Sequence, residues 1–232
     1  MKVKTIVWVR WNLPLGPPHE SRNIVRERAG WNAERLRLWR RYCMASLLRQ
    51  THGQFEVWLL CDPALDRWNR ELAATFPDDR FQVVCDSHTV AARMSGADQY
   101  IFARIDSDDV YGDDALATYA SAATDMGDKR YVQCEEGWVF DEQSGRIWEW
   151  NNPSPAFFAL VTGPDGLDTY HPHLAHHGRI RPESVEIIGR RMFVVICHGG
   201  NVCNRPRGRW VGQEMRGAQR DAVAEEFGLA PR

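Results

Sequence analysis

The sequence has no apolar run long enough to cross a lipid bilayer, which takes about 20 residues. The apolar part of its N-terminal segment, Met1 to Arg10, is too short for a signal peptide and is not followed by a small-residue cleavage site. No transmembrane segment or secretion signal is therefore indicated, and we expect a cytoplasmic protein.

Paired cysteines are also missing. The six cysteines are scattered without a C-x-x-C pair, which argues against both a zinc ribbon and a disulfide framework. The histidines at 171, 173, 176 and 177 have no cysteine or carboxylate at matching spacing, so a zinc site is disfavoured there too. Buried, reduced thiols are the simplest interpretation.

The glycine-rich phosphate motifs are absent as well. The sequence contains no G-x-G-x-x-G and no P-loop, so the dinucleotide-binding and P-loop ATPase interpretations lose support. It also contains no internal repeat and no low-complexity linker.

Lysine is scarce: only three of the 29 basic residues are lysines, and the net charge is -2. Eight arginines lie between positions 22 and 49, and a second group is formed by Arg205, Arg207, Arg209 and Arg216. Such patches can meet phosphate, nucleic acid or an anionic membrane. The alternative is a solvated helix face, which we favour for the first group and weigh evenly against phosphate contact for the second.

What the sequence does contain is an alternation of strands and helices. Strands are expected over 3–9, 55–61, 81–84 and 100–105, with helices over 33–49, where Asn32 is a candidate N-cap, and over 64–76. This alternation predicts parallel pairing in an α/β fold. Later, a helix is expected near 113–126, strands over 131–140, 146–150 and 192–197, and a closing helix or partly ordered tail over 213–227.

A cluster of carboxylates ends the strand over 100–105. Asp106 and Asp108 project to the same side of an extended chain and repel each other unless a cation lies between them. Oxygen ligands suit Mg²⁺ or Mn²⁺, which are often shared with substrate phosphates, and ligands bind at the carboxyl ends of such strands. The alternative is a helix N-terminus, a role that Asp113 and Asp114 fit better.

In these residues the chain resembles glycosyltransferases of the GT-A fold and, more narrowly, the bacterial putative rhamnosyltransferase family. The resemblance covers most of the chain in the expected order, and the Arg104 to Asp109 segment, with its D-x-D motif, is its most specific part. The matching segments are Val9-Arg10-Trp11-Asn12, Glu34-Arg35-Leu36-Arg37-Leu38-Trp39, Ser46-Leu47-Leu48-Arg49-Gln50, Phe55 to Asp62, Arg104 to Asp109, and His198-Gly199-Gly200-Asn201.

The resemblance implies a GT-A-like, Rossmann-related mixed sheet flanked by helices, in a single domain over 1–232. Residues 1–110 would form its nucleotide-binding half and 111–232 its acceptor half. It also implies a nucleotide-sugar donor, with Asp106 near the ribose or a metal, Asp108 on a divalent cation, and His198 completing the metal or diphosphate site. Mn²⁺ or Mg²⁺ would then neutralise charge on the departing nucleoside diphosphate.

Further site residues follow from strand ends. Arg10 and Asp62 each follow a strand of the first half and are expected, together with Arg104 and Asp106, to bind the donor. An inverting transfer needs a general base, for which Glu136 and Glu214 are the candidates we select. Glu135, Asp165 and Asp168 remain open alternatives, and a retaining transfer would need no such base.

The expected activity is a metal-dependent glycosyltransferase of hexosyltransferase type acting on a hydroxyl of a glycan or small molecule. A glycosyltransferase acting on modified DNA bases is an alternative, since the arginine groups would contact phosphates. A non-catalytic nucleotide-sugar-binding module is a second alternative. A nucleotidyltransferase or phosphohydrolase is disfavoured, because a two-metal site needs a second carboxylate set that the sequence lacks.

Overall fold

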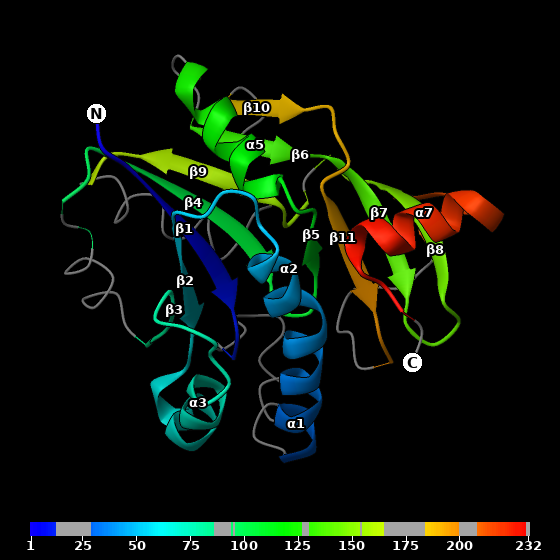
Figure 1. Cartoon of the computed structure of the whole chain (residues 1–232), viewed down its shortest axis with the longest axis horizontal. Coiled ribbons are helices and arrows are strands. Elements are labelled where there is room, and N and C mark those ends of the chain that lie inside the picture. The colour runs from blue at the N-terminus through cyan, green and yellow to red at the C-terminus, as the bar shows by residue number, and fades with distance from the viewer. Residues whose placement is uncertain are drawn as a thin grey trace.

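The computed structural model describes residues 1–12, 29–85, 94, 96–126, 130–153, 155–164, 184–199 and 208–230. In this part of the chain the strands form two mixed sheets, one of seven strands and one of five, with helices packed against them (Figure 1). The expected α/β class with a mixed sheet is confirmed, and the later strands build a second mixed sheet that the sequence did not predict.

The first sheet has the strand order β10-β6-β9-β4-β1-β2-β3. Within it β1, β2, β3 and β4 are parallel, as expected, and β9 is antiparallel to both of its neighbours, β4 and β6. The bounds are β1 Val3–Arg10, β2 Phe55–Leu60, β3 Phe81–Val84, β4 Gln99–Asp106, β6 Tyr131–Cys134, β9 Phe158–Thr162 and β10 Val185–Ile188.

The second sheet has the order β12-β8-β7-β11-β5. The expected hairpin is present, since β7 and β8 pair antiparallel around the turn after Asp141. The bounds are β5 Val110–Tyr111, β7 Glu136–Asp141, β8 Arg146–Asn151, β11 Phe193–Cys197 and β12 Val211–Met215.

One continuous helical segment leads from α1 (Ala29–Leu38) through a π-helical stretch (Trp39–Cys43) into α2 (Met44–Leu48). The other helices are α3 (Asp66–Ala73), α5 (Ala115–Ala122) and α7 (Gly217–Phe227); short 3₁₀ turns precede α3 at Pro63–Leu65 and follow α5 at Ala123–Asp125. The expected cap at Asn32 is wrong: α1 begins at Ala29, and the Asn32 side chain instead donates to Glu71 at 3.1 Å.

The two faces of the first sheet are covered differently. One face joins a core with α1, α2, α3 and α5 and also with Val139 and Phe193 of the second sheet. The other face carries an aromatic cluster that includes Trp8, Trp58 and Phe102. Among the described residues no helix contributes to that cluster, so the expected helix cover is found on one face only.

A third core lies on the other face of the second sheet and joins that sheet to the helical segment and to α7. It packs Leu38 and Tyr42 from the helical segment against strand residues such as Phe140 and Ile196, and against Val223 of α7. Figure 1 shows α7 lying across the strands of this sheet. The second sheet is therefore buried on both faces, and its position relative to α1 is fixed by packing.

Two expectations about the second half are wrong. The segment 131–140 is not one strand: it divides at Glu135 into β6, in the first sheet, and β7, in the second. The segment 213–227 is not one helix either, because β12 extends through Met215 and α7 begins only at Gly217, whose φ of 51° breaks the chain direction.

Five of the six cysteines lie in the part of the chain that the structure describes. Cys43, Cys61, Cys85, Cys134 and Cys197 are free thiols, and Cys203 lies outside the described residues. None of the helices that the structure describes is long and apolar enough to cross a membrane.

Candidate functional site

Parallel pairing brings three sequence-predicted residues to one edge of the first sheet. Arg10 ends β1 and lies opposite Asp106, which ends the neighbouring strand β4. Asp62 follows β2, the neighbour of β1 on its other side. Carboxyl ends of adjacent parallel strands form the usual ligand-binding edge of an α/β sheet. Arg10, Asp62 and Asp106 therefore lie together where a donor site was expected.

The Asp62 side chain stabilises the turn that follows β2 at this edge. Its side chain caps the 3₁₀ turn by accepting from Ala64 N at 2.9 Å, and its own backbone N–H donates to Asn12 Oδ1 at 2.6 Å. Asn12 in turn donates to Asn69 Oδ1 at 2.9 Å. These bonds fix the loop after β2, and the binding of a ribose or base by Asp62 stays a prediction.

Arg104 is buried and orients its neighbours. Its guanidinium donates to Ala156 O at 2.8 Å and to Asp106 Oδ1 at 3.1 Å, and its own carbonyl accepts from the Tyr111 hydroxyl at 2.7 Å. The Arg104 side chain is 1% exposed, whereas that of Asp106 is 32% exposed. Asp106 is therefore the member of this pair that a ligand can reach.

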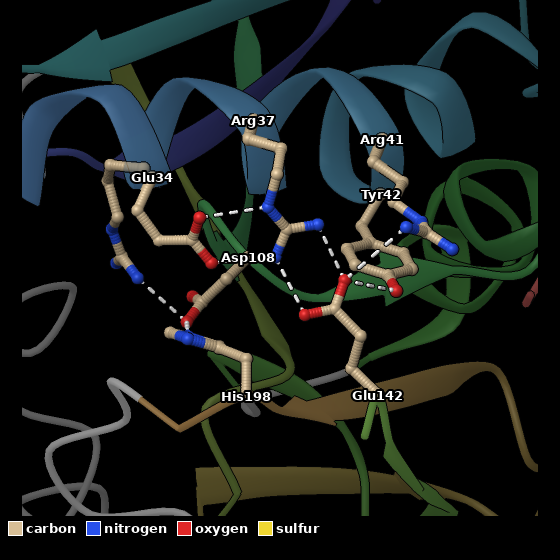
Figure 2. Close-up of polar contacts among 8 residues, drawn as sticks. Glu34, Arg37, Arg41, Tyr42, Asp108, Glu142 and His198 are labelled. Atoms are coloured by element: carbon tan, nitrogen blue, oxygen red, sulfur yellow. Dashed lines mark hydrogen bonds and ion pairs between the residues drawn. The ribbon is translucent and has the colours of Figure 1, made fainter. Parts of the chain in front are cut away.

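Asp108 is the centre of the cluster. Its Oδ2 accepts a hydrogen bond from Arg35 Nη1 at 2.7 Å and lies 3.0 Å from His198 Nε2 (Figure 2). Burial alone would raise the pKa of Asp108, but the charge of Arg35 and the contacts with His198 outweigh it and lower the pKa to about 2. Asp108 is therefore ionised at neutral pH, and the expected proximity of His198 to Asp108 is confirmed.

Asp109 connects the turn to the second sheet. Its Oδ1 accepts from the backbone N–H of Ile196 in β11 at 3.0 Å, in a buried position. Burial, followed by the charges of Asp108 and Asp106, raises the pKa of Asp109 well above its usual range. Asp109 is thus a structural carboxyl that positions the strand carrying His198.

A second buried carboxylate, Glu142, lies beside the first (Figure 2). Arg37 donates to its two oxygens at 2.6 and 2.7 Å, the Tyr42 hydroxyl donates at 3.0 Å, and Arg41 lies 3.6 Å away. Arg37 also donates to Glu34 at 2.9 and 2.7 Å. This network attaches the helical segment to the turn between β7 and β8.

Two arginines of the first group, Arg35 and Arg37, do not lie on a solvated helix face, although Arg40 and Arg49 of the same group are exposed. The side chains of Arg35 and Arg37 are 18% and 27% exposed and contact the buried carboxylates Asp108 and Glu142. Sequence reasoning did not assign Arg35, Arg37, Tyr42 or Glu142 to the site. No local pattern marks them, because their partners are distant in sequence.

The candidate bases lie at different places. The register puts Gln133 of β6 level with Arg104 of β4 across β9, so Glu135 is level with Asp106, two strands or about 10 Å away. Glu136 begins β7 of the second sheet, 3.5 Å from Arg191, and the β7–β11 register puts it level with Met192, six residues before His198. Glu214 instead lies on edge strand β12 and pairs with Arg146 at 2.5 Å. That strand is four positions from β5, on the order of 20 Å.

The register therefore brings Glu135 level with Asp106, whereas Glu136 and Glu214 lie farther from the carboxylate cluster. The role of each as a base stays a prediction. Other expected contributors fall outside the described residues: Asp165, Asp168, the histidines at 171, 173, 176 and 177, Gly200, Asn201, Arg205 and Arg207. Arg209 is described, and its guanidinium carbon lies 4.2 Å from the centre of the Trp210 ring.

Whether these residues fit a divalent cation depends on what they present. Asp106 and Asp108 offer carboxylate oxygens and His198 a ring nitrogen, ligand types that Mn²⁺ accepts. However, Arg35 already contacts the Asp108 oxygen that faces His198. Among the residues that the structure describes, no group of three or more His, Cys, Asp or Glu side chains is arranged to hold a metal ion. The donor set does not fit a preformed metal site, and metal dependence stays a prediction.

Comparison with known families identifies the chain. The model of the family described as "Putative rhamnosyl transferase" matches residues 16–210, which is most of the sequence. The protein is therefore a glycosyltransferase-family chain, and it belongs to this rhamnosyl transferase family. A comparison with curated proteins finds no match.

Solved structures with a similar arrangement include S. aureus TarS 1-349 and GlyE from Streptococcus pneumoniae TIGR4. The TarS chain has a TM-score of 0.45 and 12% identity, with 83% of this chain and 60% of that chain covered. The GlyE glycosyltransferase has a TM-score of 0.35 and 10% identity, covering 82% and 46%; its apo-form has 0.41 and 9%, covering 98% and 60%. This chain thus spans well under two thirds of the length of these proteins.

Proposed function

We propose that this chain transfers a sugar from a nucleotide-sugar donor to a hydroxyl group of a glycan or small molecule, within a GT-A-like fold. The observation that supports the proposal most is the ionised, buried Asp108 held between Arg35 and His198 at the carboxyl edge of β4. A site with buried charges of both signs at a strand end is suited to a charged ligand such as a nucleoside diphosphate. Membership in the rhamnosyl transferase family supports the same reaction class.

In this proposal the edge residues bind and orient the donor. Arg10, next to Asp106 at the end of β1, contacts the nucleotide, and the part-exposed Asp106 carboxylate accepts hydrogen bonds from donor hydroxyls. Arg104 keeps Asp106 in one orientation. Asp108 positions the two groups that contact it, Arg35 and His198.

The transfer breaks the bond between the anomeric carbon and the diphosphate oxygen, and the electron pair leaves with the nucleoside diphosphate. The acceptor oxygen bonds to the anomeric carbon, and its proton passes to a base. For an inverting reaction we place Glu135 in that role, because the register of the first sheet puts it level with Asp106. The stereochemistry decides whether that base is used.

The test is nucleotide release from UDP-, GDP- and dTDP-sugars, with and without candidate acceptors, in buffers containing Mg²⁺ or Mn²⁺. We expect acceptor-dependent release with at least one donor. Asp108→Asn keeps the shape but removes the charge, so we expect at least a 100-fold fall, of the order seen when a positioned electrostatic group is removed. Asp79→Asn, the same change at an exposed position, is the matched control.

Thermal unfolding of both variants separates loss of activity from loss of fold. If the wild type releases nucleotide from none of the donors tested, the proposed reaction is contradicted. Full activity of Asp108→Asn would remove Asp108 from it.

A further inference from the structure

We propose that Arg35 is a donor-binding residue whose guanidinium, held by Asp108, contacts the diphosphate and provides the positive charge otherwise expected from a divalent cation. The proposal rests on the proposed function, because it names the group that meets the donor at the same edge. It departs from the expectation of metal dependence, because the Arg35 guanidinium already contacts the Asp108 carboxylate that was expected to bind the cation.

The contacts of Arg35 leave it able to bind a ligand. Its Nη1 donates to Asp108 Oδ2 at 2.7 Å, and its guanidinium carbon lies 5.7 Å from the ring centre of Trp31. Its Nε is buried and has no hydrogen-bond partner among the described residues. A guanidinium carries five N–H donors in a planar fork that matches phosphate oxygens. With 18% of its side chain exposed, Arg35 is oriented by Asp108 yet reachable from solvent.

The charges at this edge are already balanced without an added cation. Asp106 is paired with Arg104 at 3.1 Å and Asp108 with Arg35 at 2.7 Å, so each of these two carboxylates has one guanidinium. A divalent cation bound to Asp108 Oδ2 would lie next to the Arg35 charge, and repulsion between like charges is strong where water is excluded. A diphosphate instead gains attraction from Arg35 and leaves the Asp108 pair intact.

The helical segment holds Arg35 in place from its other side. Two residues along, Arg37 is bound to Glu142, and Leu38 and Trp39 are fully buried. On the N-terminal side, Asn32 donates to Glu71 of α3. The same helix is anchored by its buried residue Asn69. A side chain carried by a fixed helix loses little freedom when a ligand binds, which favours affinity.

The experiment measures binding of UDP, GDP and dTDP by calorimetry in excess chelator, using the wild type, Arg35→Ala, Arg35→Lys and the control Arg40→Ala. Arg40 is an exposed arginine on the same helical segment. We expect the wild type to bind at least one nucleotide without metal. Arg35→Ala should weaken that binding about 10- to 100-fold, the equivalent of hydrogen bonds to a charged group. Arg35→Lys should be intermediate because it loses the fork, and Arg40→Ala should be unchanged.

Adding Mn²⁺ gives a second readout. In Arg35→Ala the Asp108 carboxylate loses its guanidinium partner, so Mn²⁺ should restore part of the lost nucleotide affinity. In the wild type the same addition should change affinity by less than about threefold. Wild-type binding that disappears with chelator, or an Arg35→Ala variant that binds as the wild type does, would overturn the proposal.

These outcomes are separable from failure of the proposed function. If Arg35→Ala loses nucleotide binding but no sugar is transferred by the wild type under any condition, the transfer reaction fails and the role of Arg35 stands. If transfer occurs only with metal and survives Arg35→Ala, the role of Arg35 fails and the transfer reaction stands. Should Arg35→Ala prove unfolded, the chelator experiment on the wild type and the Arg35→Lys variant still decide.

Discussion

At the scale of single residues, the junction of the two sheets depends on the absence of one side chain. A Cβ added at Gly137 of β7 would overlap the ring of Phe193 in β11. That ring is itself stacked on Phe157, with centroids 3.8 Å apart and planes 9° from parallel. Gly137 therefore allows an aromatic pair to fill the space beside the strand that begins at Glu136.

We expect Gly137→Ala to lower the free energy of unfolding by about 1–3 kcal/mol, the usual cost of overpacking a filled core. For a chain of this length that corresponds to a fall in Tm of about 2–4 °C per kcal/mol. Gly189→Ala is the control, since a Cβ there meets nothing within 4 Å. Equal melting temperatures for the two variants would show that Phe193 can move aside.

At the scale of elements, the helical segment from α1 to α2 carries the side chains that reach both carboxylate sites. Arg35 contacts Asp108, while Arg37 and Tyr42 contact Glu142 at the β7–β8 turn (Figure 2). Arg35 and Arg37 precede the π-helical stretch Trp39–Cys43, and Tyr42 lies within it, buried together with Trp39 and Cys43. Stretches of this kind occur often at functional sites, where they change the direction of the side chains that follow.

The Glu142 network should make stability depend on pH. Burial raises the pKa of Glu142, but hydrogen bonds from Arg37 and Tyr42 and the charges of Arg37 and Arg41 hold it below the usual 4.5. Because the folded pKa is lowered, this stabilisation is complete above about pH 4.5 and is lost as the pH falls below it. Asp108, with a pKa lowered to about 2, should act in the same direction between about pH 4 and 2.

We expect Glu142→Gln to lower the free energy of unfolding at pH 7 by about 1.5–3 kcal/mol, since hydrogen bonds to a charged group are lost. Its stability should also fall less steeply than that of the wild type between pH 5 and 3. Chemical unfolding across this range measures both effects. Parallel pH profiles for the two proteins would show that Glu142 does not carry the titration.

At the scale of the whole molecule, the chain is rich in arginine but is not basic overall. The net charge is -2, and several arginines of the first group are paired internally with Asp108, Glu142, Glu34 or Asp113. A protein that binds DNA through phosphates releases counterions, and its affinity then falls steeply with salt, by a log–log slope of about 0.9 per contact. Arginines that are paired internally, as Arg35, Arg37 and Arg49 are, offer few such contacts.

We therefore expect weak binding to duplex and single-stranded DNA, with a log–log salt slope below about 2. The variant with Arg205, Arg207 and Arg209 all changed to alanine should behave as the wild type does. Fluorescence anisotropy at a series of salt concentrations measures the slope. Tight, steeply salt-dependent binding that the triple variant loses would favour a nucleic-acid acceptor instead.

The sequence by itself determined the first half of the fold and one side of the site. The strands β1 to β4 are short apolar segments whose pattern is local, so their existence and their parallel pairing, though not their order in the sheet, could be predicted. The carboxylates Asp106 and Asp108 follow one of these strands directly, which placed them at the carboxyl edge before any contact was known. The later strands β9, β10 and β12 are short and paired with distant partners, and their pattern did not reveal them.

Only the tertiary structure decided what surrounds the carboxylates. Arg35 and Asp108 are 73 positions apart, and Arg37 and Glu142 are 105 apart, so no local period relates them. Their contacts arise from the packing of α1 between the two sheets, and from the division at Glu135 that moves the chain from one sheet to the other. Local patterns report which face of an element is apolar, whereas the partner of a buried charge depends on how the elements pack.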